Sequence, residues 1–275
     1  MSALVSGAAG NAGAAPLQDR RSSLVGDVVA VFLREMFLVL RDPFSLIFSL
    51  VQPLVFLALF GPLLAGSVDP AALGGQSPLQ WFLPGVIVMI CLFGTGAAGS
   101  NLLFEISLGS YERVLASPLR RSAILIGRAL KELAPLVVQA ALIVVVSIPF
   151  GFVLYPLQVI AGLLLLGVFG IGMGAFSYAL AIASRKREWM FWAVQQSLLF
   201  PLLILSGMML PLENGPRWMQ VLGAFNPLTY IVNAERALFS GSFTDPAIGW
   251  AVLAAVLTCA AGLWVGVKQV HRSTS

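Results

Sequence analysis

Few side chains in this sequence belong to the types that carry out covalent chemistry. The one histidine, His271, lies near the C-terminal end, and both cysteines, Cys91 and Cys259, lie inside apolar runs. This excludes a Ser/His/Asp set, a disulfide framework and a zinc site of ordinary spacing. A phosphate loop, a G-x-G-x-x-G after a strand and an H-E-x-x-H metal motif are also absent. We predict no catalytic residue and no metal site, and assign His271 to a solvated tail.

The remaining polar side chains interrupt a very apolar sequence. Of its 275 residues, 59% are hydrophobic and 10% are charged, whereas soluble domains carry about 25% charged residues. Such a chain has too few charges to cover a water-facing surface, so we predict a polytopic, all-α membrane protein. Residues 1–26 are rich in small residues and lack a signal-peptide pattern, which indicates a disordered cytosolic tail.

Six segments are apolar enough to cross a bilayer, which requires roughly 20 residues in a helix. The third and fourth are separated by "LYPLQ", a short helical hairpin marked by Pro156. The predicted spans are 44–66, 82–104, 133–153, 158–183, 189–210 and 247–267.

Basic residues predict the orientation of these spans. With both termini in the cytosol, 14 of the 16 lysines and arginines lie on the cytosolic side, and only Arg217 and Arg236 lie outside. Lysine and arginine favour cytosolic loops, so we predict six spans with both termini inside. The segment 268–275 is then a second cytosolic tail.

A candidate amphipathic helix precedes the first span. In "DVVAVFLREMFLVLRDP" the charges fall at near-heptad spacing on one narrow helical face, and the rest of the surface is apolar. We predict an interfacial helix over 27–42, ended by Pro43. An N-terminal extension of the first span is the alternative. The charged residues are Asp27, Arg34, Glu35, Arg41 and Asp42.

The longest cytosolic loop, residues 105–132, mixes basic and apolar residues. Its second half, "LRRSAILIGRALKEL", places Arg121, Arg128 and Lys131 broadly on one helical face. Positive anchoring at a membrane surface and docking to a cytosolic partner explain this pattern equally well.

The stretch "LSGMMLPLENGPRWMQVLGAFNPLTYIVNAERALF", residues 205–239, breaks the apolar pattern between the fifth and sixth spans. Asn214-Gly215-Pro216 and Asn226-Pro227 are helix-start signals. We therefore predict two short helices that enter the outer leaflet and return, because neither is long enough to cross. A plain amphipathic outer loop is the alternative.

A few polar residues lie inside the predicted spans. Such residues usually face a bundle interior, as contacts between helices or as the lining of a pathway, and the sequence leaves both roles open. They are Gln52, Asn101, Gln139, Gln195 and Gln196.

Two of these stretches resemble ABC type-2 exporter permeases, including those of the daunorubicin-resistance type. Residues 205–239 are similar to a late signature of that family, in which S-G-x-x-x-P-L and P-x-W precede N-P-L-T-Y and an arginine. The segment "ERVLASPLRRSAILIGR" is similar to the family's first cytosolic loop. The resemblance extends over residues 27–267.

The resemblance implies a permease subunit in a bacterial plasma membrane that exports drugs or antibiotics. Two copies would form a homodimer among membrane lipids and bind two separate ATPase subunits, which would hold the ATP and Mg²⁺. No cofactor is expected on this chain, and no nucleic acid is an expected partner. The implied ATPase-docking residues are Arg34, Arg41, Tyr111, Glu112, Arg113, Pro118, Arg120 and Arg121.

The resemblance also implies a pathway at the interface between the two copies, lined by the first, second and fifth spans and closed outside by the two short helices. The charges at 213, 217, 235 and 236 would then lie near water. The implied outer-gate residues are Pro211, Glu213, Trp218, Asn226, Pro227, Tyr230 and Arg236. The pathway candidates are Gln52, Asn101, Gln195 and Gln196.

The apolar spans favour a hydrophobic or amphipathic substrate such as a drug, an antibiotic or a lipid. A polysaccharide or lipid-linked oligosaccharide exporter is the alternative within the family. An ion-coupled secondary transporter is the alternative from another class. Such carriers usually bury acidic residues at mid-membrane, and Glu105, Glu132 and Glu188 fall at predicted span ends.

Overall fold

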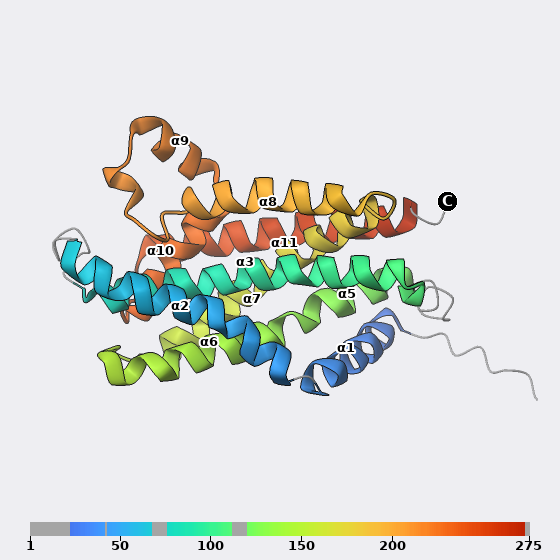
Figure 1. Cartoon of the computed structure of the whole chain (residues 1–275), viewed down its shortest axis with the longest axis horizontal. Helices are drawn as coiled ribbons and strands as arrows, with labels where there is room; N and C mark the ends of the chain where they lie inside the picture. Colours follow the sequence, from blue (N-terminus) through green and yellow to red (C-terminus); the bar gives the residue numbers. More distant parts are fainter. Residues whose placement is uncertain (1–22, 42, 68–75, 112–119, 273–275) are drawn as a thin grey trace, which may run out of the picture.

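The computed structural model describes residues 23–41, 43–67, 76–111 and 120–272, and these contain helices and no strand. The long helices lie side by side in a single elongated bundle (Figure 1). The elements are α1 (Leu24–Arg41), α2 (Pro43–Ser67), α3 (Pro78–Ser107), α5 (Arg121–Lys131), α6 (Leu133–Ser147), the short 3₁₀ helix η2 (Ile148–Phe150), α7 (Pro156–Ala183), α8 (Glu188–Ile204), the 3₁₀ helix η3 (Leu212–Asn214), α9 (Arg217–Phe225), α10 (Pro227–Phe239) and α11 (Pro246–Arg272).

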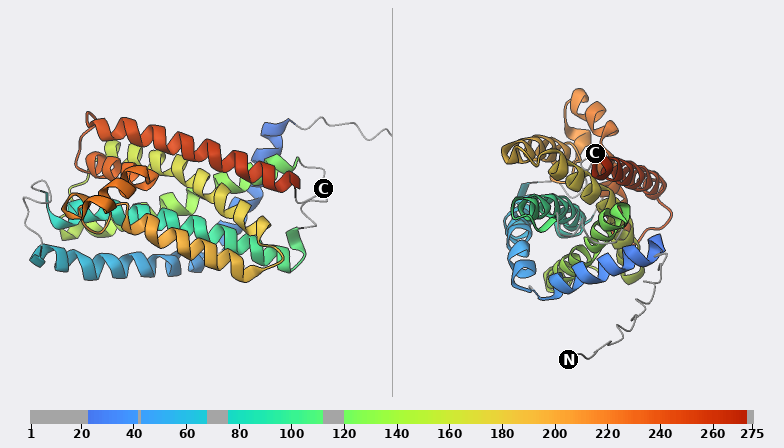
Figure 2. Two further views of the ribbon diagram at one scale, coloured as in Figure 1. Left: turned by 90° about the horizontal axis from the view of Figure 1, so that it is seen from above. Right: turned by 90° about the vertical axis from the view of Figure 1, so that its right-hand side faces the viewer.

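The two ends of the bundle differ. At one end α1 lies across the bundle, so that the end-on view of Figure 2 shows α1 lengthwise and the long helices nearly end on. The C-terminal end of α11 lies at this same end (Figure 1). At the opposite end, α9 and α10 fill the connection between α8 and α11. The predicted amphipathic helix and the two predicted short helices therefore lie at opposite ends of the molecule.

Among the residues that the structure describes, four helices are long and apolar enough to cross a membrane. They are Pro78–Ser107, Arg121–Phe150, Pro156–Ala183 and Pro246–Arg272. Within α2, the apolar stretch Leu50–Leu63 is shorter, and α8 has 17 residues. The described residues therefore establish an all-helical bundle with several candidate spans, and six spans stay a prediction.

Prolines and small polar caps set most helix starts. Pro78 and Pro156 lie at the first helical position, where a missing N–H costs nothing. Ser77 caps α3, since its side chain accepts a hydrogen bond from the backbone N–H of Gln80 at 3.1 Å. A predicted helix start at Pro216 was wrong by one residue, because Pro216 is itself the N-cap and α9 begins at Arg217.

Glycines allow the helices of the bundle core to approach closely. A Cβ at Gly172 of α7 would lie 2.6 Å from the backbone oxygen of Thr258 in α11, and Gly262 faces Gly172 across the same crossing. A Cβ at Gly99 of α3 would collide with Ser177 of α7. Because small residues lie at these crossings, no side chain holds the helices apart and their backbones touch directly. Helix α7 thus lies between α3 and α11 as the centre of the fold.

Two helix ends differ from the bounds of the predicted segments. The fifth span was expected to reach residue 210, but α8 ends at Ile204 because Gly207 takes a left-handed turn with φ of +72°. The cytosolic tail was expected over 268–275, and α11 continues through its first part to Arg272, so its place in the cytosol stays a prediction. Apolar composition alone predicts neither the turn after α8 nor the continuation of α11 to Arg272.

Candidate functional site

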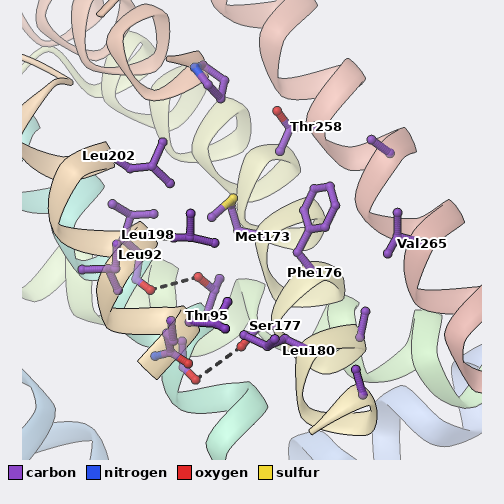
Figure 3. Close-up of a pocket in the computed structure, with 18 of the residues that line it drawn as sticks. Leu92, Thr95, Met173, Phe176, Ser177, Leu180, Leu198, Leu202, Thr258 and Val265 are labelled. Carbon is purple, nitrogen blue, oxygen red and sulfur yellow. Dashed lines mark hydrogen bonds between the residues drawn. The ribbon is translucent and has the colours of Figure 1, made fainter. Parts of the chain in front are cut away.

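A pocket of about 720 Å³ lies between α8 on one side and α3, α7 and α11 on the other. Figure 3 shows Leu92, Met173, Phe176, Leu198, Leu202 and Val265 around it. Aliphatic side chains make up most of the lining, and Phe176 is its only aromatic residue among those described. The pocket therefore suits a molecule with a large apolar surface.

The hydroxyl groups of this pocket are largely bonded to nearby helix backbone. Thr95 donates to the carbonyl oxygens of Cys91 at 2.8 Å and Leu92 at 3.1 Å. Ser177 donates to the carbonyl oxygen of Gly96 at 3.4 Å (Figure 3). By contrast, Oε1 of Gln195 is buried without a hydrogen-bond partner in the described part of the chain. Gln195 is therefore a polar group at which a guest molecule could form a hydrogen bond.

Helix α8 is a loosely held wall of this pocket. Only Phe191, Leu199 and Leu203 of its residues are buried. Trp189, 67% exposed, is among its many exposed apolar side chains. A wall with so few buried contacts is the part of the pocket most easily displaced.

Side chains of α10 hold the C-terminal end of α8. The last carbonyl groups of a helix have no partner within it and require other donors. Asn226 donates through Nδ2 to the carbonyl oxygen of Leu202 at 2.7 Å, and Thr229 donates to that of Leu205 at 3.1 Å. Asn226 also caps α10 by accepting from the N–H of Leu228 at 3.1 Å. The N-P-L-T run thus caps the start of α10 and supplies donors to carbonyl groups at the end of α8.

Arg236 makes the corresponding contacts one turn beyond the end of α8. Its guanidinium donates to the carbonyl oxygens of Gly207 at 2.9 Å, Met208 at 3.1 Å and Trp81 at 3.2 Å. The same group lies 3.5 Å from the centroid of the Trp81 ring, a cation–π contact. Arg236 therefore joins α10, the turn after α8 and the start of α3.

A second, more polar pocket of about 650 Å³ lies at this end of the bundle. Pro211, Glu213, Tyr230 and Arg236, predicted as gate residues, all line it. Of the other predicted gate residues, Trp218 is 61% exposed and Asn226 is buried beneath α8, as described above. Pro227 lines the first pocket instead. The structure thus brings four of the seven together around one pocket.

One expectation at this end was wrong. Glu235 was expected near water, yet its side chain is fully buried at 0% exposure on the inner face of α10. Its neighbour Arg236 is directed the other way, toward Trp81 and the turn after α8. Successive helix residues point about 100° apart, so adjacent charges of opposite sign need not share a surface.

A cluster of ion pairs lies at the opposite end, where α1 packs on α5. Arg128, 5% exposed, has Nε 3.3 Å from Oε1 of Glu35 and donates through Nη2 to Oε2 of Glu105 at 2.6 Å. Lys131 lies 3.7 Å from both Glu35 and Glu132. Glu132 in turn accepts a hydrogen bond from Tyr178 of α7 at 2.8 Å. We call these six residues the ion-pair cluster; it joins α1, α3, α5 and α7.

The cluster explains how α1 is oriented. Of the charges expected on one solvent-facing side, Asp27 and Glu35 are buried against α5, whereas Arg34 and Arg41 are exposed. The expectation of a single exposed charged face was therefore wrong, because the carboxylates turn inward: Glu35 pairs with Arg128, and Asp27 accepts from the N–H of Arg120 at 3.3 Å. Asp42 lies outside the described residues.

Part of the apolar surface of α1 points away from the bundle, whereas Val28 and Val31 pack against α5. Val25, Val29, Leu33 and Phe37 are exposed. Exposed apolar residues over a whole helix face suit contact with lipid.

The predicted docking residues fall into three groups. Arg34, Arg41, Arg120 and Arg121 are exposed at the α1 end of the bundle. Tyr111 is buried, with its ring 5.9 Å from the guanidinium carbon of Arg128, and burial raises the pKa of its phenol. Glu112, Arg113 and Pro118 lie outside the described residues.

The predicted pathway residues do not form one group. Gln195 lines the first pocket, whereas Gln52, Asn101 and Gln196 are exposed and are not part of its lining. The pocket lies within one chain, between α8 and the helices α3, α7 and α11, so a pathway between two copies stays a prediction.

Sequence reasoning missed three features of these sites: the pairing of Glu35 with Arg128, the stacking of Trp81 on Arg236, and the burial of Glu235. A usable signal existed for the first. Three and four positions from Glu35, on the same helix face, the residues are apolar: Val31, Phe32, Leu38 and Val39. A lone charge there is expected to meet a charge of opposite sign.

Comparisons with known proteins agree with the family resemblance described in the sequence analysis. Residues 27–240 match the ABC-2 type transporter family. The chain is 31% identical over 215 residues to the transport permease ycf38 of Cyanophora paradoxa, covering 77% of this chain and 74% of that protein. It is 29% identical over 224 residues to the daunorubicin resistance ABC transporter permease DrrB1 of Streptomyces coeruleorubidus, covering 81% and 78%. It is 25% identical over 166 residues to the multidrug ABC transporter permease YbhR of Escherichia coli, covering 58% and 44%.

Helices long enough to cross a bilayer, an apolar pocket between them and a family match over most of the length agree with one another. The chain is a multi-pass membrane protein that belongs to the ABC-2 type transporter family, the permease subunits that work with an ABC ATPase.

Proposed function

We propose that this chain is the membrane-spanning subunit of an ATP-driven exporter that moves a hydrophobic or amphipathic compound out of a bacterial cell. The observation that carries the proposal is the apolar pocket of about 720 Å³ between α8 and α3, α7 and α11. Its volume falls in the range of pockets that hold drug-sized molecules, roughly 300–1,000 Å³. DrrB1 and YbhR, two relatives named for drug resistance and multidrug transport, agree with this substrate class.

The lining favours an apolar substrate over a sugar chain. Saccharides are commonly held by aromatic faces and many hydrogen bonds, and Phe176 is the one aromatic residue among the described residues that line the pocket. The hydroxyls of Thr95 and Ser177 already donate to backbone carbonyls. Gln195 supplies a buried acceptor without a partner among the described residues, and Thr258 and Gln269 add polar groups on the α11 side, which suits a substrate with a few polar groups on a large apolar body.

Charge distribution supports an orientation with both termini in the cytosol. The exposed arginines of α1 and the α5 start, together with Lys268 and Arg272 of α11, lie at one end of the bundle. Positive charge of this kind favours the cytosolic side. In this orientation α2, α3, α5 with α6, α7, α8 and α11 supply six crossings, α1 lies in the inner interface, and α9 and α10 form re-entrant segments at the outer face.

The ATPase would act at the α1 end. Two ATPase subunits, holding ATP and Mg²⁺, would dock on the exposed arginines Arg34, Arg41 and Arg120 of each of two identical permeases. The ion-pair cluster lies directly behind this surface and reaches α3 and α7, which line the pocket. A displacement of α1 or α5 would therefore be transmitted to the pocket through the ion-pair cluster, whose contacts are mostly buried.

The test is co-purification in mild detergent with the ATPase encoded beside this gene, followed by reconstitution in vesicles. We expect ATP hydrolysis that depends on this chain and ATP-dependent movement of a hydrophobic fluorescent dye. Val265→Trp should fill part of the pocket and slow dye movement several-fold. Val256→Trp, on the same helix but 52% exposed and outside the pocket, is the matched control.

Two results would count against the proposal. Transport along an ion gradient without any ATPase would favour a secondary carrier. Equal dye movement by the Val265→Trp and Val256→Trp variants would show that the pocket is not on the substrate route.

A further inference from the structure

Glu235 is a fully buried carboxyl group that the proposed transport route does not use. Its exposed fraction is 0%, and neither carboxyl oxygen has a hydrogen-bond partner among the residues that the structure describes. A carboxylate in such a place lacks both water and a compensating charge, so its charged form is strongly disfavoured. Either the group is protonated in this arrangement or the arrangement changes when the group ionises.

The surroundings of Glu235 form a closely fitted site. Oε2 points at Gly162 of α7, where an added Cβ would collide with the carboxyl group. The same Cβ would lie 3.1 Å from a ring carbon of Phe239. Glycine at 162 therefore leaves a notch on α7 that the carboxyl of α10 fills. Neither of the two pockets described above includes Gly162 or Glu235 in its lining. The close fit at Gly162 suits a proton as the ligand of this carboxyl group.

Neighbouring charges do not neutralise this carboxyl. Arg236 is held by three backbone carbonyls on the other side of α10. On α3, Cys91 is close enough to be influenced by the charge of Glu235, whereas Glu105 lies 14 residues further along and pairs with Arg128. On α7, the one titratable residue is Tyr178, which donates to Glu132.

The other helices packed on α10 add no partner. On α9, Arg217 is exposed. The titratable residues of α11 are Cys259, Lys268, His271 and Arg272. Cys259 lies at the crossing with Gly172, and the other three lie in its last two turns at the α1 end. Desolvation accordingly dominates and raises the pKa of the Glu235 carboxyl.

We propose that Glu235 is a proton-binding site whose protonated form keeps α10 seated in the Gly162 notch. Loss of the proton creates a charge that the notch cannot hold, and α10 moves outward toward water. Because Asn226, Thr229 and Arg236 tie α10 to the end of α8, this movement loosens the wall of the substrate pocket. Proton binding at the outer end thus controls whether the α8–α10 corner is closed.

The sign of the pH effect follows from the raised pKa. The folded form binds the proton more tightly than the unfolded chain does, so the stability from the seated carboxyl is fully present at acidic pH. It is lost as pH rises from the ordinary range of a glutamate through the raised pKa of the folded state.

The experiment uses the purified full-length chain in detergent, without ATPase or substrate. Thermal unfolding is followed by tryptophan fluorescence from pH 5.5 to 9 for the wild type, Glu235→Gln and Glu213→Gln. Glu213 is an exposed glutamate at the same end of the bundle. We expect Tm to fall by several degrees with rising pH in the wild type and in the Glu213→Gln control. The Glu235→Gln variant, which imitates the protonated acid, should lose most of this fall.

Two further measurements remain decisive if Glu235→Gln folds poorly. Hydrogen exchange of the wild type should show protection factors over 227–239 that drop several-fold at high pH while those of α7 persist. An infrared carbonyl band of a protonated carboxylic acid should be present at neutral pH. Equal pH profiles for the wild type and Glu235→Gln, pH-independent protection of α10, or a missing acid band would overturn the proposal. None of these readouts depends on ATP, so their failure leaves the exporter assignment standing, and the reverse also holds.

Discussion

Replacing Arg128 by methionine tests whether the ion-pair cluster holds the α1 end together. Methionine keeps most of the side-chain volume but removes the guanidinium that contacts Glu35 and Glu105. The two carboxylates differ in access to water. Glu105, whose side chain is 34% exposed, can rehydrate, whereas that of Glu35 is 5% exposed and would keep only Lys131 at 3.7 Å. The cost of the change therefore lies mainly at Glu35.

Breaking a buried pair by removing one partner costs about 3–5 kcal/mol, because a charge is left uncompensated. Rehydration of Glu105 and the remaining Lys131 contact place Arg128→Met near the lower value, about 3 kcal/mol. For chains of 150–250 residues each kcal/mol shifts Tm by roughly 2–4 °C, which gives a fall of about 6–12 °C. The double variant Arg128→Met/Glu35→Gln removes the orphaned charge and should recover at least half of this fall.

The assay is thermal unfolding of the detergent-purified protein, with Arg34→Met as the control. Arg34 is an exposed arginine on α1, so its loss should change Tm little. The reasoning would be refuted if Arg128→Met melted with the Arg34→Met control. It would also be refuted if the double variant were no more stable than Arg128→Met, since the cost would then not come from a stranded Glu35.

Three other changes have expected outcomes that thermal unfolding measures. Asn226→Ala removes the α10 cap and the donor to Leu202, and should cost about 2 kcal/mol, whereas the exposed Asn214 should tolerate alanine; equal Tm values would contradict the capping role. Gly172→Ala should lower Tm because its Cβ meets backbone of α11, whereas Gly94→Ala, with nothing within 4 Å, should leave Tm unchanged or raise it. Gln195→Leu should keep or raise Tm because it removes a buried acceptor that has no partner; a large fall would reveal a partner for that amide.

Much of the helical framework follows from local chemistry. Proline at the first helical position and Asn226 as a cap are signals carried by one or two residues, and the structure places helix starts at Pro43, Pro156 and Pro227. The segment after residue 204 shows where this reasoning stops. Met208, Met209 and Leu210 continue the apolar pattern, but the left-handed Gly207 and the carbonyl contacts of Arg236 turn the chain. A hydropathy window does not contain that information.

The candidate sites were harder to predict because they depend on contacts between distant residues. Ser177 reaches the carbonyl oxygen of Gly96 only because α3 and α7 lie against each other. Glu35 and Arg128 are 93 residues apart, and periodicity within one helix does not reveal that they meet. Glu235 shows the same limit most clearly: an Asn-Ala-Glu-Arg run looks solvated in sequence, whereas the packing of α10 on α7 buries the acid and leaves the arginine at the pocket.

The backbone contact between Gly172 and Gly262 has a mechanical consequence. Where two helices touch without intervening side chains, sliding or separation would open a void along their whole crossing, so α7 and α11 behave as one stiff unit. Helix α8 has no such crossing and buries three residues. The bundle is therefore uneven in stiffness, with one rigid wall and one compliant wall facing each other across the pocket. We expect a change of shape to be a displacement of α8 against a fixed frame, so that a single hinge after residue 204 sets the width of the pocket.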